Sequence, residues 1–183
     1  MPDWLNAASF LGLTDRDVAM AVEKYLPDYW DLSLRGVRLL IAACIREAVE
    51  LSKARQYLSA GDKVLYFNMP AAPVCMYANK LAGKGALHTA YPGYMMIMVL
   101  GAFFNKGLGN YDGMCSLNTH CRHCAMNAMR AQAVDSGILP PPTVSWGWGL
   151  KCSEGPKTDE MLECLRGSEW KNVYLTIPYD ASS

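Results

Sequence analysis

Short apolar runs alternate with segments of helical periodicity from residue 63 onward, and this alternation constrains the fold more than any other feature. Each apolar run is only a few residues long and follows turn-forming residues, as buried parallel strands do. The runs span residues 63–68, 143–146 and 172–177. Segments with helical character lie between them, at 74–81, 94–104, 115–136 and 157–165. Strands that alternate with helices predict an α/β domain of three layers with a parallel sheet.

Two amphipathic helices are expected ahead of this domain. The first begins at Thr14, a good N-cap residue, and Pro27 is expected to end it. The second covers residues 32–58, where apolar side chains recur at helical spacing and predict one buried face. The sequence therefore predicts an α-helical N-terminal extension over residues 1–61 and an α/β domain over residues 62–183.

Composition argues against nucleic-acid and membrane partners. The 17 basic and 17 acidic residues give a formal net charge of zero, whereas a general nucleic-acid binder carries a basic excess. The longest apolar run, 94–104, is about half of the roughly 20 residues that a membrane-spanning helix needs. The N-terminus has no basic-then-apolar signal pattern, so a cytoplasmic location is expected.

The seven cysteines favour metal binding over disulfides. A reducing cytoplasm keeps thiols free, and an odd number leaves at least one cysteine unpaired. Three cysteines stand singly among apolar or helical neighbours and are expected to pack in the core: Cys44, Cys75 and Cys164. The other four are clustered in sequence: Cys115, Cys121, Cys124 and Cys152.

The clustered cysteines are the candidate metal ligands. Cys115 is expected at a helix N-terminus, where the dipole stabilises a thiolate, and Cys152 lies in a later strand-to-helix loop. Loops at one edge of a parallel sheet are neighbours, so both sulfurs are expected to face one cavity, which suits an iron–sulfur cluster or zinc. Cys121 and Cys124 have a spacing common in zinc sites, and packing on the helix is their alternative role.

Several motifs then follow one another in a definite order. Cys115-Ser116 opens a helix, Gly-Ile-Leu-Pro-Pro-Pro at 137–142 leads to a strand, and Cys152 precedes a Lys-x-x-Glu-x-Leu motif at 157–162. The last strand ends near Pro178-Tyr179. This order, over about residues 63–180, resembles the benzoyl-CoA reductase / 2-hydroxyacyl-CoA dehydratase family. The resemblance covers only the first Rossmann-like domain and the N-terminal helices of that family.

The resemblance implies a Rossmann-like domain that binds a [4Fe-4S] cluster, with Cys115 and Cys152 as cluster ligands. It implies a subunit or fragment of an iron–sulfur acyl-CoA dehydratase or reductase, whose low-potential one-electron chemistry forms a ketyl or ring radical on a CoA thioester. The implied partners are a related subunit in a heterodimer or homo-oligomer, an ATP-dependent activator protein and the acyl-CoA substrate. Family members take a third cysteine ligand from a second Rossmann-like domain.

The chain departs from the family pattern near both ligands. Leu117-Asn118 stands where the family has an aromatic residue and an arginine, and Trp146-Gly147-Trp148-Gly149 replaces polar residues before Cys152. The third ligand would then be Cys121 or Cys124, or would come from a partner chain.

Two other functions remain open on the sequence. One is a non-catalytic zinc or iron–sulfur domain for assembly or electron transfer, which would require Cys121 and Cys124 for metal retention. The other is a metal-free interaction domain. The acid–base candidates near the cysteine cluster are His88, Tyr91 and His120, each with a structural role as the alternative, because no partner carboxylate is evident from the spacing.

Overall fold

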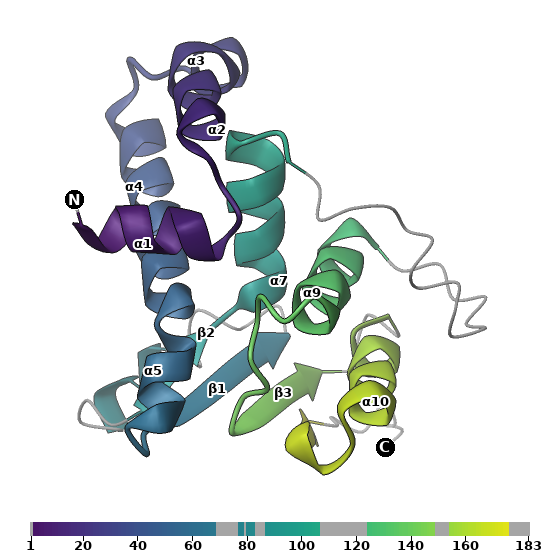
Figure 1. Cartoon of the computed structure of the whole chain (residues 1–183). Helices are drawn as coiled ribbons and strands as arrows, with labels where there is room; N and C mark the ends of the chain where they lie inside the picture. The colour runs from purple at the N-terminus through teal and green to yellow at the C-terminus, as the bar shows by residue number, and fades with distance from the viewer. Residues whose placement is uncertain are drawn as a thin grey trace, which may run out of the picture.

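The computed structural model of the chain is an α/β arrangement in which helices pack on a small parallel sheet (Figure 1). The structure describes residues 2–68, 77–78, 80–82, 87–106, 124–148 and 154–175.

Four parallel strands form the sheet: β1 (Lys63–Asn68), β2 (Leu87–Ala90), β3 (Val144–Trp148) and β4 (Asn172–Leu175). Their order is β2-β1-β3-β4, and β1 pairs with both β2 and β3. This confirms the predicted Rossmann-like α/β fold with N-terminal helices. β2 was not predicted, because it has only four residues and two of them, His88 and Thr89, are polar.

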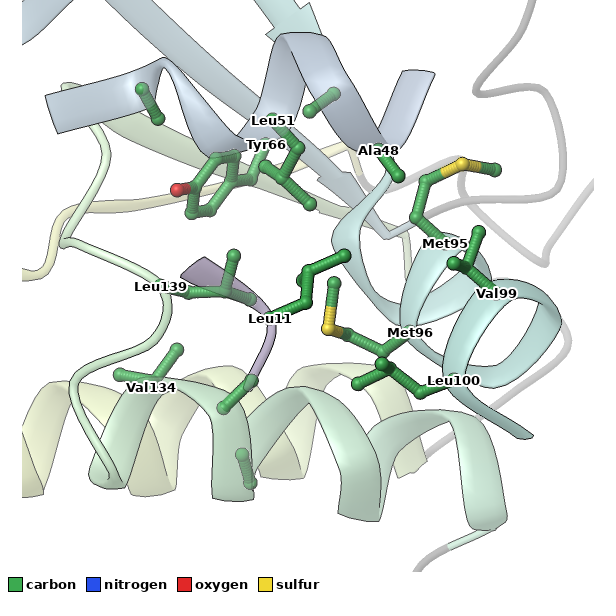
Figure 2. Packing of buried hydrophobic residues seen from close by; sticks show 14 of the residues in the cluster. Leu11, Ala48, Leu51, Tyr66, Met95, Met96, Val99, Leu100, Val134 and Leu139 are labelled. Atoms are coloured by element: carbon green, nitrogen blue, oxygen red, sulfur yellow. The ribbon is translucent and has the colours of Figure 1, made fainter. Parts of the chain in front are cut away.

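The main hydrophobic core lies on the sheet face that carries Val64 and Tyr66. Helices from both halves of the chain cover it: α1 (Pro2–Phe10), α4 (Arg35–Ser52), α7 (Pro92–Met95), α9 (Ala125–Asp135) and α10 (Glu154–Arg166). Figure 2 shows Leu11, from the turn after α1, pointing into this core beside Leu139 and Met96. Helix α1 was not predicted. Its burial makes the N-terminal segment part of the same core as the sheet.

The first predicted helix is longer than expected. Thr14 caps α2 (Asp15–Met20), as predicted, but the chain stays helical through the π-helix η1 (Ala21–Tyr25) and α3 (Leu26–Tyr29). Pro27 therefore does not end the helix. Proline has no N–H and crowds the preceding turn, and the wider π-helical turn immediately before it accommodates that defect.

Two further helical segments differ from their predicted form. The segment predicted at 32–58 is divided at Lys53 into α4 and α5 (Ala54–Ser59). The apolar run at 94–104 forms α7 and the π-helix η2 (Met96–Phe103), and a short 3₁₀ turn, η3 (Gly167–Glu169), follows α10. Within the described residues, no helix is long and apolar enough to cross a membrane.

Asp17 connects the N-terminal helices to the end of η2. Its carboxylate accepts hydrogen bonds from the backbone N–H and hydroxyl of Thr14, at 2.7 and 2.8 Å, and lies 2.9 Å from Nζ of Lys106. These bonds lower the pKa of Asp17 from 3.8 to about 2. The bond from the Thr14 backbone has the largest effect, and the bond from Lys106 has the next largest. The ionised Asp17 carboxylate therefore stabilises the folded state above pH 3.8, and this stabilisation is lost as the pH falls toward about 2.

We expect Asp17→Asn to lower the free energy of unfolding at pH 7 and to have little effect at about pH 2. Urea unfolding as a function of pH measures this difference. Asp15→Asn, which changes an exposed carboxylate of the same helical turn, is the matched control and should change stability little. An equal loss at both pH values would contradict the assigned role of Asp17.

Gly93 allows α7 to approach α9 closely. A Cβ atom at this position would lie 3.0 Å from Cγ and 3.3 Å from the carbonyl oxygen of Met126. We expect Gly93→Ala to destabilise the fold by about 1–3 kcal/mol, because the helix backbone has to shift. Gly36→Ala, in α4, meets nothing within 4 Å and should stabilise by up to about 1 kcal/mol. Thermal unfolding of both variants tests the contrast.

Candidate functional site

The site lies at the carboxyl edge of the sheet, where the strand order reverses. From β1 the chain continues to β2 on one side, whereas β3 and β4 lie on the other. Open parallel sheets bind ligands at such switch points, outside the carboxyl ends of the strands. Figure 1 shows α9 and α10 beside each other next to the tip of β3.

Cys124 stands at the point where the N-termini of α9 and α10 meet. It is the N-cap residue of α9, with extended backbone, and its thiol is exposed. The side-chain amide of Asn127 donates a hydrogen bond to its sulfur at 3.4 Å. Its backbone N–H donates to the carboxylate of Glu154, the first residue of α10, at 3.2 Å. These contacts place an exposed thiol beside the first turns of two helices.

A buried ion pair holds the same two helices together below this edge. Arg130 of α9 and Asp159 of α10 are both fully buried, and an Nη atom lies 2.6 Å from Oδ1 of the carboxylate. The hydroxyl of Ser145, on β3, donates to the same oxygen at 3.2 Å. The pair therefore ties α9, α10 and β3 to one another.

Burial dominates the electrostatics of this pair. Loss of water raises the pKa of Asp159, and the charge of Arg130 opposes that shift. Burial likewise lowers the pKa of Arg130, and Asp159 opposes this change. Nε of Arg130 has no hydrogen-bond acceptor among the described residues. Each charge therefore depends on the other for its stability in the interior.

Gly147 lets this region pack closely. A Cβ atom there would lie 3.0 Å from Oδ2 of Asp159 and 3.0 Å from the ring of Tyr174 on β4. A larger residue near the end of β3 would therefore press on the buried carboxylate. The glycine interpreted above as a departure from the family pattern has a packing role in this chain.

The two described acid–base candidates, Tyr91 and His88, lie at different positions along the strands of the sheet. Tyr91 follows the last residue of β2, at the carboxyl edge, and its ring stacks on Tyr94 with centroids 5.8 Å apart. His88 pairs with Val64 toward the amino end of the sheet. Its Nε2 lies 3.0 Å from a carboxylate oxygen of Asp62, which belongs to the turn before β1. This carboxylate partner was not visible in the sequence. His120 lies outside the described residues.

The structure describes three of the seven cysteines. Cys44 is buried, as predicted, and Cys164 is exposed on α10, so the prediction that it packs in the core was wrong. Cys75 and three of the predicted ligands, Cys115, Cys121 and Cys152, lie outside the described residues.

The helix predicted over 115–136 needs one correction. The described helix begins at Ala125. Cys124, directly before it, has an extended backbone and is therefore not part of the helix. Gly137 follows its end with φ 76°, as a C-terminal glycine should.

Among the described side chains, Cys124 is the candidate metal ligand. In the part of the chain that the structure describes, no group of three or more His, Cys, Asp or Glu residues is placed to hold a metal ion. Cys124 fits as one ligand, because its thiol is exposed and already accepts a hydrogen bond. A site of three or more ligands would therefore need at least one residue from outside the described part of the chain.

Comparison with known proteins gives no relative. No family model matches the chain, and neither a curated protein nor a solved structure is significantly similar to it. The functional proposal therefore rests on the geometry of the site and on the resemblance of the motifs described above.

The buried pair can be tested by removing one partner. We expect Arg130→Met to cost about 3–5 kcal/mol in free energy of unfolding, because it leaves Asp159 buried without its counter-charge. The double variant Arg130→Met/Asp159→Leu should recover part of this loss, since no unpaired charge remains. Arg16→Met, at an exposed position, should change stability by less than about 0.5 kcal/mol. Urea unfolding measures all three, and a double variant no better than the single one would contradict the pairing.

Proposed function

We propose that the chain binds a [4Fe-4S] cluster through cysteine thiolates at the carboxyl edge of the sheet. We further propose that it is a subunit of an enzyme that dehydrates or reduces an acyl-CoA by low-potential one-electron chemistry. The observation that carries the proposal is the environment of Cys124, whose exposed sulfur lies at the meeting point of two helix N-termini and accepts a hydrogen bond from Asn127.

Three features of Cys124 favour cluster ligation. Its sulfur is exposed and therefore open to coordination by iron, which cysteine sulfurs bind in such clusters. Hydrogen bonds to ligand sulfurs are one of the ways in which a protein sets a cluster's reduction potential, and the Asn127 amide supplies such a bond. Glu154 fixes the backbone of Cys124 and thereby the direction of the sulfur.

The sequence neighbours of these residues supply the further candidate ligands. Cys121 is three residues before Cys124, and Cys152 is two residues before Glu154. Two or three residues of chain span at most about 7–11 Å. With Cys115 and Cys152 as the two ligands implied by the family resemblance, Cys124 would serve as the third. In the family, that ligand belongs to a second domain.

In this proposal the cluster supplies one low-potential electron to the CoA thioester. The chain's residues hold the cluster and tune it: Asn127 through its bond to sulfur, and Glu154 through its bond to the backbone. Tyr91 follows β2 at the carboxyl edge of the sheet and is the acid–base candidate that the structure describes at that edge. A related subunit and an ATP-dependent activator protein would be the partners.

We expect anaerobically purified chain to contain about four irons and four acid-labile sulfides, with a broad visible absorption near 400 nm. Cys124→Ser should lower the iron and sulfide content and the absorption. Cys164→Ser is the matched control, because Cys164 is also exposed but lies in α10, ten residues beyond Glu154. It should leave the metal content unchanged.

The same measurement separates the alternatives. One zinc per chain without sulfide, lost in both Cys121→Ser and Cys124→Ser, would replace the cluster with a structural zinc site. Chain without iron, sulfide or zinc, or equal loss of iron in Cys124→Ser and Cys164→Ser, would overturn the proposed role of Cys124.

A further inference from the structure

A cavity lies beside β2, at the outer edge of the sheet. Its volume is about 680 Å³, within the range of small-molecule sites. Three parts of the chain enclose it: α4, the helical residues that precede β2, and the segment from β2 into α7. The lining residues are Arg46, Glu47, Glu50, Tyr77, Lys80, Thr89, Tyr91, Tyr94 and Met95.

Three tyrosines give this cavity an aromatic lining. Tyr91 and Tyr94 stack on each other with ring centroids 5.8 Å and planes 22° apart, so they are held as a rigid pair. Met95 and Thr89 are buried beside them, whereas Tyr77 is 67% exposed on the opposite, helical side. An exposed aromatic ring facing a cavity with a stacked pair is suited to contact a planar ligand.

The charged groups of the cavity favour an anion. Glu50 is already engaged, because Tyr57 donates a hydrogen bond to it at 2.6 Å and Nζ of Lys53 lies 3.5 Å away. Arg46, Lys80 and Glu47 form no ion pair with any other residue that the structure describes. The lining thus carries two cations, Arg46 and Lys80, and two carboxylates, Glu47 and Glu50. The charge of Lys80 helps to lower the pKa of Glu50, so Arg46 is the cation that is most available to an anionic ligand.

We propose that this cavity binds a planar aromatic ligand that carries a phosphate or carboxylate group. The ring contacts the tyrosines, and the anionic group is bound by Arg46 and Lys80, of which the arginine offers two parallel N–H donors. This inference does not depend on the proposed cluster. It assigns Tyr91 to the wall of a binding site, in addition to its place at the carboxyl edge of the sheet.

Calorimetric titration of the full chain tests the proposal with defined probes. Adenosine 5′-monophosphate represents a nucleotide source of the aromatic anion, and benzoate represents an aromatic acid. Adenosine lacks the charge, and cyclohexanecarboxylate lacks the planar ring. We expect at least one aromatic anion to bind at least 10-fold more tightly than its matched control, and the one that binds identifies the source.

Variants locate the binding in this cavity. We expect Tyr77→Ala and Arg46→Gln each to weaken binding of that probe about 5- to 20-fold while far-UV circular dichroism stays unchanged, because both side chains are exposed. The controls are Tyr29→Ala, a 75% exposed tyrosine on α3, and Arg35→Gln, an exposed arginine at the start of α4. Binding of neither anion, equal binding of the uncharged or non-planar probes, or equal weakening by the control variants would overturn the proposal.

Discussion

The ion pair between Arg130 and Asp159 is the interaction on which the rest of the site depends. Two charges without access to water are costly, and they are tolerated because each is the other's counter-ion at 2.6 Å and Ser145 adds a further bond. The pair and the Ser145 bond set the distances between α9, α10 and β3 at this level of the core. The pair thus determines how α9 and α10 lie against β3, and with that where their N-termini meet.

Two glycines allow the helices and strands around the ion pair to pack closely. Gly93 lets α7 approach α9, and Gly147 lets β3 approach both Asp159 and the ring of Tyr174. The starts of three helices consequently gather around the carboxyl ends of the strands. Cys124 lies on one side of these helix N-termini. The tyrosine-lined cavity lies on the other side, beyond β2. The same fold therefore supports two separate sites with different chemistry. One is the thiol of Cys124, and the other is the cavity lined by tyrosines and cationic side chains.

The sequence predicted the elements whose signal is local. β1, β3, β4 and α10 follow from apolar runs and helical spacing, whereas β2 is too short and too polar to be recognised alone. Leu11 lies deep in the core, but its place depends on helices that follow much later in the chain. Proline predicts a helix end at Pro27, and the π-helical turn that precedes it has no sequence signature that would reveal it. The Arg130–Asp159 pair joins residues 29 positions apart, and Cys124 was recognisable as a metal ligand candidate but not as an N-cap.

The central position of β1 has a consequence for how the chain folds. Its neighbours in the sheet come from distant parts of the sequence: Val64 bonds to Thr143, 79 positions away. Parallel pairing allows no hairpin to start the sheet, and closing so long a loop costs entropy before any strand contact compensates for it. Because helical contacts are local and this pairing is not, we expect the helices to form before β1 gains its partners. Folding of this chain should accordingly be slow for its size, and its unfinished sheet is the stage most prone to aggregation.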